Sequence, residues 1–298
     1  MKKSIYNILL ILISILAFNS CIEEEDIELN KYPDYLIVRA ELLLDEFAVV
    51  DLNYSRDFAL SSNDGNSDQI NRSAVSNAHV ILKDSNGIEE LLEESTFPKE
   101  NGRYYSKLIK GAENTSYELL IDVDGKHYSA TSRIGKPIKV DKVKFRNVKG
   151  KSIDNNITED IEIDVSWKDR KNEKNFYLLK IRERNINKEK NELIFIDRET
   201  FLFSDLNNDG NDIKYTCEIA NAYYLGSYYN NGYRSLYAFL CLIDEQTYTY
   251  LKGVKGHGRV DNSIITARPG NLPTNIRGHA FGLFNACPAS SMEIDYTQ

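Results

Sequence analysis

Residues 205–216, with the sequence DLNNDGNDIKYT, begin with the ligand spacing of a calcium-binding loop. Asp205, Asn207 and Asp209 stand at the first, third and fifth positions of such a loop, where calcium takes oxygen ligands, and a glycine stands at the sixth position, where the chain must turn. The twelfth position should supply a bidentate glutamate but holds Thr216, and the flanking residues resemble strands rather than helices. We therefore interpret the segment as a polar hairpin turn and keep calcium as the weaker alternative.

The histidines do not form a metal or catalytic motif. No H-E-x-x-H sequence is present, so each histidine is interpreted as a surface or hydrogen-bonded side chain. No G-x-S-x-G sequence is present either, which removes the simplest hydrolase hypothesis. A glycosidase carboxylate pair stays open, because such a pair is defined by its separation in space. We expect no enzymatic activity and no cofactor. The four histidines are His79, His127, His257 and His279.

A tyrosine-rich segment at residues 221–239 is the candidate binding surface of the chain. Tyrosine offers a large apolar area with a hydrogen-bonding tip, which suits recognition, but a hairpin whose tyrosines pack across its two strands would look the same in sequence. Both interpretations stay open. The tyrosines of the candidate surface are Tyr223, Tyr224, Tyr228, Tyr229 and Tyr233.

Cys21 follows a pattern that predicts covalent modification. Lys2 and Lys3 precede an apolar run at residues 4–18, and a small residue, Ser20, stands directly before the cysteine. The run is too short to span a bilayer comfortably and is typical of a secretory signal peptide. The cysteine at its end resembles the acylation site of bacterial lipoproteins. We expect residues 1–20 to be removed and Cys21 to carry a lipid anchor.

Five acidic residues follow the expected anchor within eight positions. Such a run is either a solvated, extended tether or an address. The second interpretation rests on its resemblance to the surface-export signal of Bacteroidota lipoproteins. It predicts an outer-membrane protein that faces the cell exterior, with residues 21–34 as the tether. The export signal would consist of Glu23, Glu24, Glu25 and Asp26.

The composition of the chain argues against one class of partner and limits the number of disulfides. The chain has 37 basic and 45 acidic residues, a net charge of −8, which argues against a nucleic-acid partner. Apart from Cys21 it contains Cys217, Cys241 and Cys287, so at most one disulfide can form among these three. No C-x-x-C spacing is present, and the pairing cannot be inferred from sequence.

The elements that would position these residues are mostly strands. Residues 116–132 alternate apolar and polar side chains around Asp124-Gly125, which predicts a tight hairpin. Residues 160–169 alternate strictly, with Trp167 on the apolar face. Further strands are expected at residues 35–43, 102–108, 175–184, 192–197 and 235–244, and residues 77–87 are expected to form a strand followed by a turn. One helix is expected at residues 245–254, capped by Asp244, and residues 277–294 form another extended segment. Pro137 marks a linker between two sandwiches.

Several segments in this order resemble a known family. They include YLIVRAEL, NAHVILKDSNG, GRYYSKL, SYELLIDVDGKHYSATS, SWKDRKNEKNFYLLKI, FLFSDLNNDG and NLPTNIRGHAFGLFNA. Together they are similar to a Bacteroidota outer-membrane lipoprotein family known as domain of unknown function 4249, over residues 35–298.

This resemblance implies a mainly β fold and a location, but no catalytic residues. It implies an immunoglobulin- or transthyretin-like sandwich at residues 35–136 and a fibronectin type III-like β domain with a C-terminal extension at residues 137–298. The genes of the family often lie beside TonB-dependent transporters, so we expect a non-enzymatic accessory or binding partner of such a transporter. The alternatives are a structural or adhesive surface module and, third, an enzyme acting on glycans or peptides.

Overall fold

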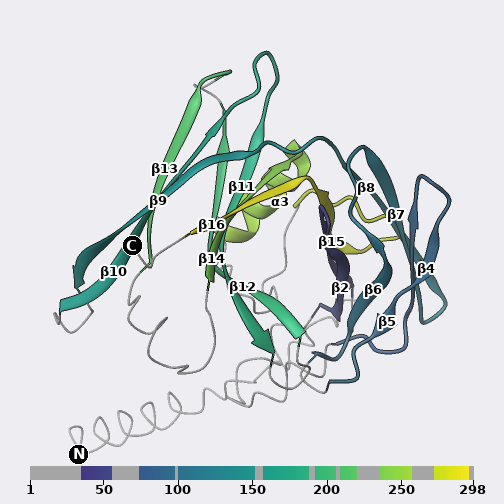
Figure 1. Ribbon diagram of the computed structural model, residues 1–298. Helices are drawn as coiled ribbons and strands as arrows, with labels where there is room; N and C mark the ends of the chain where they lie inside the picture. The colour runs from purple at the N-terminus through teal and green to yellow at the C-terminus, as the bar shows by residue number, and fades with distance from the viewer. Residues whose placement is uncertain are drawn as a thin grey trace, which may run out of the picture. The chain divides into compact units, whose positions relative to one another are not determined.

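A computed structural model of the chain describes residues 35–55, 74–97, 100–151, 157–187, 192–205, 209–219, 235–256 and 272–294. The described residues all belong to one compact unit, Asp34–Gln298. The described part is mainly β with one α-helix, as the sequence predicts (Figure 1).

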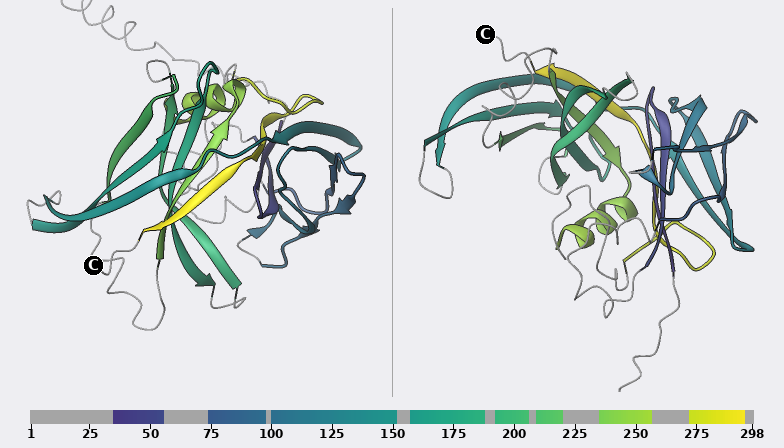
Figure 2. Two further views of the ribbon diagram at one scale, coloured as in Figure 1. Left: turned by 45° about the horizontal axis from the view of Figure 1, so that its top comes forward. Right: turned by 90° about the horizontal axis from the view of Figure 1, so that it is seen from below.

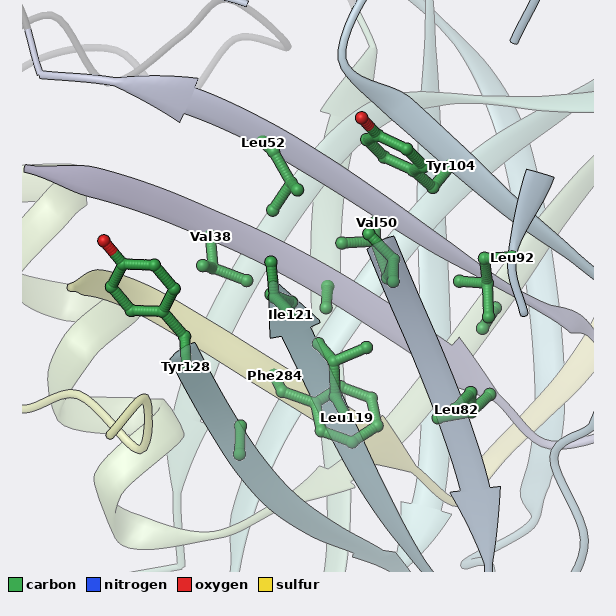
Figure 3. Close-up of a cluster of buried hydrophobic side chains, with 14 of the residues drawn as sticks. Val38, Val50, Leu52, Leu82, Leu92, Tyr104, Leu119, Ile121, Tyr128 and Phe284 are labelled. Carbon is green, nitrogen blue, oxygen red and sulfur yellow. The ribbon is translucent and has the colours of Figure 1, made fainter. Parts of the chain in front are cut away.

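The first half of the unit consists of two sheets around one core. One sheet has the strand order β15-β1-β2-β6-β5 and the other the order β4-β3-β7-β8. Figure 3 shows Val38, Val50 and Leu52 of the first sheet facing Leu82, Leu119 and Ile121 of the second. The first sheet is formed by β1 (Leu36–Leu43), β2 (Phe47–Tyr54), β6 (Arg103–Lys110), β5 (Glu93–Glu94) and β15 (Phe281–Cys287). The second is formed by β3 (His79–Asp84), β4 (Glu89–Leu91), β7 (Thr115–Val123) and β8 (Lys126–Ile134).

The hairpin of β7 and β8 follows the expected register. Asp124 and Gly125 have φ angles of 50° and 71°, which is the left-handed conformation that a two-residue hairpin turn requires. The alternating apolar residues of β7 are buried, and Tyr128 on β8 is 5% exposed. Alternation of side chains across a strand therefore places one face of this hairpin in the core.

The second half of the unit repeats the arrangement with longer strands. One sheet has the order β13-β10-β9 and the other the order β12-β11-β14-β16. Their shared core surrounds Trp167, whose ring contacts Tyr177 edge-on at a centroid distance of 5.5 Å. The strands are β9 (Val140–Lys151), β10 (Ile157–Lys168), β11 (Phe176–Asn187), β12 (Glu192–Ser204), β13 (Asp212–Ile219), β14 (Ser235–Ile243) and β16 (Ala289–Ile294).

The expected helix is present as α3 (Glu245–Gly256), which directly follows β14. The carboxylate of Asp244 accepts a hydrogen bond of 2.6 Å from the backbone N–H of Thr247. This is the N-cap interaction expected from the sequence, because it satisfies one of the backbone donors left free at a helix start.

The C-terminal segment departs from the expected division of the chain. Residues 277–294 do not form one extended segment of the second half: β15 pairs in parallel with β1 of the first sheet, whereas β16 pairs with β14. Pro288 lies between the two strands and has no N–H to continue a ladder. The described core of the first half accordingly includes Phe284, and an assignment of all of residues 137–298 to the second half needs this correction.

The parallel pairing of β15 depends on one glycine. Gly282 lies opposite Val38, with a φ angle of 110°. A Cβ atom at this position would stand 1.8 Å from the carbonyl oxygen of Val38. Only glycine tolerates both this conformation and this approach of the two backbones.

Candidate functional site

The β7–β8 hairpin carries a shallow open depression of about 360 Å³ on the face turned away from the core. Ile81 and Leu120 supply its apolar floor, and Asp122, His127 and Arg277 supply polar groups. Asp122 lies directly opposite His127 in the β7–β8 ladder, and its Oδ1 contacts His127 Nδ1. The volume suits a small polar ligand.

One wall of the depression comes from a distant part of the chain. Arg277 and Ser129 exchange two backbone hydrogen bonds, of 2.7 and 3.2 Å, so residues 276–278 lie against the edge of β8. Gly278 makes this possible, because it has a φ angle of 103° and a Cβ atom there would stand 2.4 Å from the carbonyl oxygen of His127. The wall is therefore fixed by backbone contacts, and its glycine cannot be replaced freely.

The histidine–carboxylate pair lies in water. The side chains of His127 and Asp122 are 82% and 49% exposed, so their ion pair is screened and contributes little to stability. The hydrogen bonds described for this part of the chain do not join the Ser129 hydroxyl to His127. The arrangement can donate and accept hydrogen bonds to a ligand, but it does not activate a nucleophile in the way a catalytic triad does.

A buried ionic cluster joins the two halves of the unit. Lys180 Nζ lies 2.7 Å from Glu41 Oε1 and 3.2 Å from Asp197 Oδ2. Arg182 lies 3.2 Å from Glu46 and 3.0 Å from Asp197, measured between charged atoms. Lys180 and Arg182 come from β11, whereas Glu41 belongs to β1 of the first half. Both basic side chains are only 10% exposed. Removal of a partner would therefore leave a buried charge without compensation, which is destabilising.

We call these five side chains (Glu41, Glu46, Lys180, Arg182 and Asp197) the junction cluster. Within it, burial and opposite charges shift the pKa values in opposite directions. Burial lowers the pKa of Lys180, but the carboxylates of Glu41 and Asp197 raise it further, so its net pKa lies above 10.5. Burial raises the pKa of Glu41, and Lys180 more than offsets this, so the net pKa of Glu41 lies below 4.5. For Glu46 burial dominates and raises the pKa. The Lys180–Glu41 pair is therefore ionised over a wide pH range.

The segment that begins with the spacing of a calcium loop is held by hydrogen bonds to a neighbouring loop. The carboxylate of Asp205 accepts a bond of 2.8 Å from the backbone N–H of Asn175, and the carboxylate of Asp209 accepts one of 2.6 Å from Asn172. These carboxylate oxygens thus satisfy backbone donors of a neighbouring loop. The flanking strands β12 and β13 belong to different sheets, so the segment connects two sheets and is not the expected hairpin turn. Asn207 lies outside the described residues. Within the described part of the chain, no group of three or more His, Cys, Asp or Glu side chains could hold a metal ion.

A second buried network supports the same two loops. The hydroxyl of Tyr177 donates to the carboxylate of Asp169, which also accepts bonds from Asn175 Nδ2 at 3.2 Å and from the Gly210 N–H at 2.8 Å. Burial, followed by the hydrogen bond to Asp169, raises the pKa of Tyr177 well above 10. The network fixes the loops and keeps the phenol protonated.

Most of the remaining candidate residues lie outside the residues that the structure describes. The tyrosines of the candidate binding surface (Tyr223, Tyr224, Tyr228, Tyr229 and Tyr233) fall outside it, as do His257, Cys21 and the expected export signal. Of the same tyrosine-rich segment, Tyr237 is described, with its ring 5.6 Å from that of Phe195. His79 is exposed on β3, as expected from its place in the strand.

The three later cysteines are buried and free. Cys241 and Cys287 share a small apolar cluster with Leu43 of β1, and Cys287 Sγ lies 3.9 Å from the carbonyl oxygen of Leu242. Burial, followed by its contact with Cys241, raises the pKa of Cys287 well above 9. The Cys287 thiol is therefore a poor nucleophile in the folded chain.

Sequence reasoning missed the junction cluster and the depression. Asp122 and His127 stand symmetrically about the Asp124-Gly125 turn, so the predicted hairpin register was enough to pair them. No local signal identified Arg277, Lys180 or Glu41 as partners, because each contact joins residues far apart in the chain.

Comparison with models of known protein families identifies the family of this chain. The family model described as Domain of unknown function (DUF4249) matches residues 22–293. The chain belongs to the DUF4249 family. No curated protein matches the chain. No helix in the described part of this DUF4249 chain is long and apolar enough to cross a membrane.

Solved structures are only distantly similar to this DUF4249 chain. The crystal structure of chicken CNTN1 FN1-FN3 domains has 11% identity and a TM-score of 0.23, covering 70% of this chain and 60% of that one. Trypsin-activated alpha-2-macroglobulin from Escherichia coli has 9% identity and a TM-score of 0.21, with coverage of 72% and 15%. Carbohydrate-binding modules from the beta-sandwich super family have 9% identity and a TM-score of 0.20, with coverage of 62% and 84%. The chain thus spans less than two thirds of the first two structures.

Proposed function

We propose that this chain is a lipid-anchored outer-membrane surface protein of the Bacteroidota that acts as a non-enzymatic accessory or binding partner of a TonB-dependent transporter. The observation that carries the proposal is the order of features at the amino terminus. Two lysines, a short apolar run and Cys21 are followed directly by acidic residues, and the compact β unit begins only at Asp34.

The described unit fits a role in recognition. Its depression offers a fixed wall and a polar pair without an activated nucleophile, which suits binding better than covalent catalysis. An anchor that holds such a unit at the membrane raises its effective concentration near a membrane partner, so a weak contact is sufficient. The transporter as partner rests on the family resemblance.

The anchor is tested by intact-mass analysis of the mature protein from membranes of its own host. We expect an amino-terminal Cys21 carrying fatty acyl groups, and a Cys21→Ala variant that is released from the membrane fraction. A mature chain without fatty acid in the soluble fraction would contradict the anchor.

Surface location and partner need separate measurements. Substitution of the four acidic residues 23–26 by their amides should protect the protein from protease added to whole cells, whereas the four-residue change Glu89→Gln, Glu113→Gln, Glu118→Gln and Asp141→Asn should not. Affinity purification from solubilised outer membrane should recover a transporter barrel. Recovery of the protein without a barrel would favour the structural or adhesive alternative.

A further inference from the structure

Strand β9 and the segment leading into it carry an unusual concentration of positive charge. Eight of the 37 basic residues and one of the 45 acidic residues lie in residues 133–151, so this segment has a charge of +7 while the rest of the chain has −15. A strongly positive stretch in an acidic protein creates a local field that the net charge conceals.

The basic side chains of β9 point into solvent. Lys142, Lys144 and Arg146 alternate along one face of the strand and are exposed, whereas the exposed Lys149 lies on the opposite face. Because residues in a strand advance by about 3.3 Å each, residues 142–146 span roughly 13 Å. The three charges thus form a line rather than a pocket. We call Lys142, Lys144 and Arg146 the β9 basic row.

Two of the three side chains of the β9 basic row make no ion pair with the neighbouring strand. Asp164 of β10 lies opposite Lys144 but makes its 2.8 Å ion pair with Lys214 of β13. Glu162 pairs with Arg146. Among the ion pairs of the described residues, none involves Lys142 or Lys144. These two lysines are therefore available to an external anion.

The strand itself lies at the edge of its sheet. The order β13-β10-β9 gives β9 one ladder partner, and Figures 1 and 2 show β9 and β10 as long strands that run outward together. Val140 at the start of β9 is held by a 3.1 Å hydrogen bond from its N–H to the Ser290 hydroxyl. Beyond this contact the described edge of β9 has no further ladder.

Protection of a free edge does not account for the uniform sign of the charges. Lysine on an edge strand does prevent strands from pairing between molecules. However, the other edge strands of this half carry no basic row: β12 contains Asp197, Arg198 and Glu199, β13 contains acidic residues beside Lys214, and β16 contains Glu293 alone. Those edges do without a row of lysines, so the basic row on β9 requires a further reason.

We propose that the β9 basic row binds the phosphate groups of an anionic lipid surface. A straight, exposed row of positive charges matches a flat array of phosphates, and basic residues near such a surface each contribute independently to binding. The biological setting rests on the proposed lipid anchor, which would bring the row to a membrane. The binding itself does not need the anchor.

The experiment uses the mature chain with Cys21→Ala, so that no acyl group is present. We expect it to sediment with vesicles of phosphatidylcholine and phosphatidylglycerol, but not with phosphatidylcholine alone, and to be released by salt. Substitution of Lys142, Lys144 and Arg146 by glutamine should weaken binding roughly 100-fold, at about fivefold for each charge removed.

A control variant removes the same charge elsewhere. Glutamine at the exposed Lys107, Lys126 and Lys171 should leave binding almost unchanged, and both variants should keep the Tm of the parent. Equal loss of binding in the two variants would show a net-charge effect and overturn the proposal.

Two further outcomes would also overturn it. One is no binding to anionic vesicles at low salt. The other is salt-sensitive binding to polyglutamate without binding to vesicles, which would assign the row to an acidic protein partner. Because the protein carries no lipid in this assay, neither outcome bears on acylation of Cys21. Absence of acylation, in turn, would leave the vesicle result unchanged.

Discussion

Replacement of Lys180 by methionine tests whether the junction cluster holds the two halves of the unit together. Methionine keeps most of the length of lysine but leaves the carboxylates of Glu41 and Asp197 facing each other without the cation between them. Removal of one partner from a buried ion pair costs roughly 3–5 kcal/mol. Since Glu41 and Asp197 are 36% and 25% exposed, water offsets part of this, and we expect a loss of about 2–3 kcal/mol.

Thermal and denaturant unfolding of the unlipidated mature chain measure this loss. A change of about 2–3 kcal/mol corresponds to a decrease in Tm of roughly 5–10 °C for a unit of this size. The matched control is Lys174→Met, which removes an exposed ion pair with Glu245 whose side chains are 55% and 65% exposed. That pair should contribute less than about 1 kcal/mol.

The pH dependence separates the ionic contribution from packing. The pKa of Glu41 is below 4.5 in the folded chain, so its contribution is present above that value and is lost as the pH falls through the folded pKa. The pKa of Lys180 is raised above 10.5, so its contribution persists until the pH rises through that higher value. The stability difference between the parent and Lys180→Met should therefore be largest from about pH 5 to 10 and decrease in acid.

The reasoning would be refuted by a Lys180→Met variant whose Tm lies within about 1 °C of the parent at pH 7, or by a difference that does not change in acid. A double substitution with Glu41→Leu provides an internal check. It removes both charges, and a buried pair replaced by apolar side chains is often no less stable than the pair itself. The double variant should therefore recover part of the stability that Lys180→Met loses.

Three further outcomes are expected at other positions. Gly282→Ala should cost at least about 2–4 kcal/mol in chemical denaturation, because its Cβ would collide with the Val38 carbonyl, and an unchanged midpoint would contradict the close β1–β15 pairing. Asp244→Ala should cost about 1 kcal/mol through loss of the cap at Thr247, with Asp244→Asn retaining most of the stability. Cys287 should resist iodoacetamide in the folded chain at pH 8 and react after unfolding, because it is buried and its pKa is raised; rapid labelling without denaturant would disprove this.

Sequence patterns predicted the local elements well, because their causes lie within a few residues. The Asp124-Gly125 turn, the alternation around Trp167 and the cap at Asp244 each depend on short-range chemistry, and the structure has all three where they were expected. The fold class followed from the same patterns, since short alternating strands joined by turns favour packed sheets.

The missed features all depend on long-range pairing. Apolar alternation in residues 281–287 predicts a strand but cannot say that it pairs with β1, about 240 positions earlier in the chain. The same holds for Lys180, which lies in an apolar stretch of β11. The sequence around it predicts that the lysine is buried, but it does not show that the partner is Glu41. A buried lysine in a strand was nevertheless a signal, because such a residue requires a carboxylate nearby.

The two proposals combine into a statement about orientation. The 13 residues from Cys21 to Pro33 can extend to about 45 Å, so a lipid anchor alone would leave the β unit free to turn over a membrane. The acidic residues near the proposed anchor would not restrict this rotation, because an anionic surface repels them. The β9 basic row would supply the attraction that the tether lacks. A unit held at Cys21 and resting on β9 would have two separate points of attachment, and two points restrict its orientation where one does not.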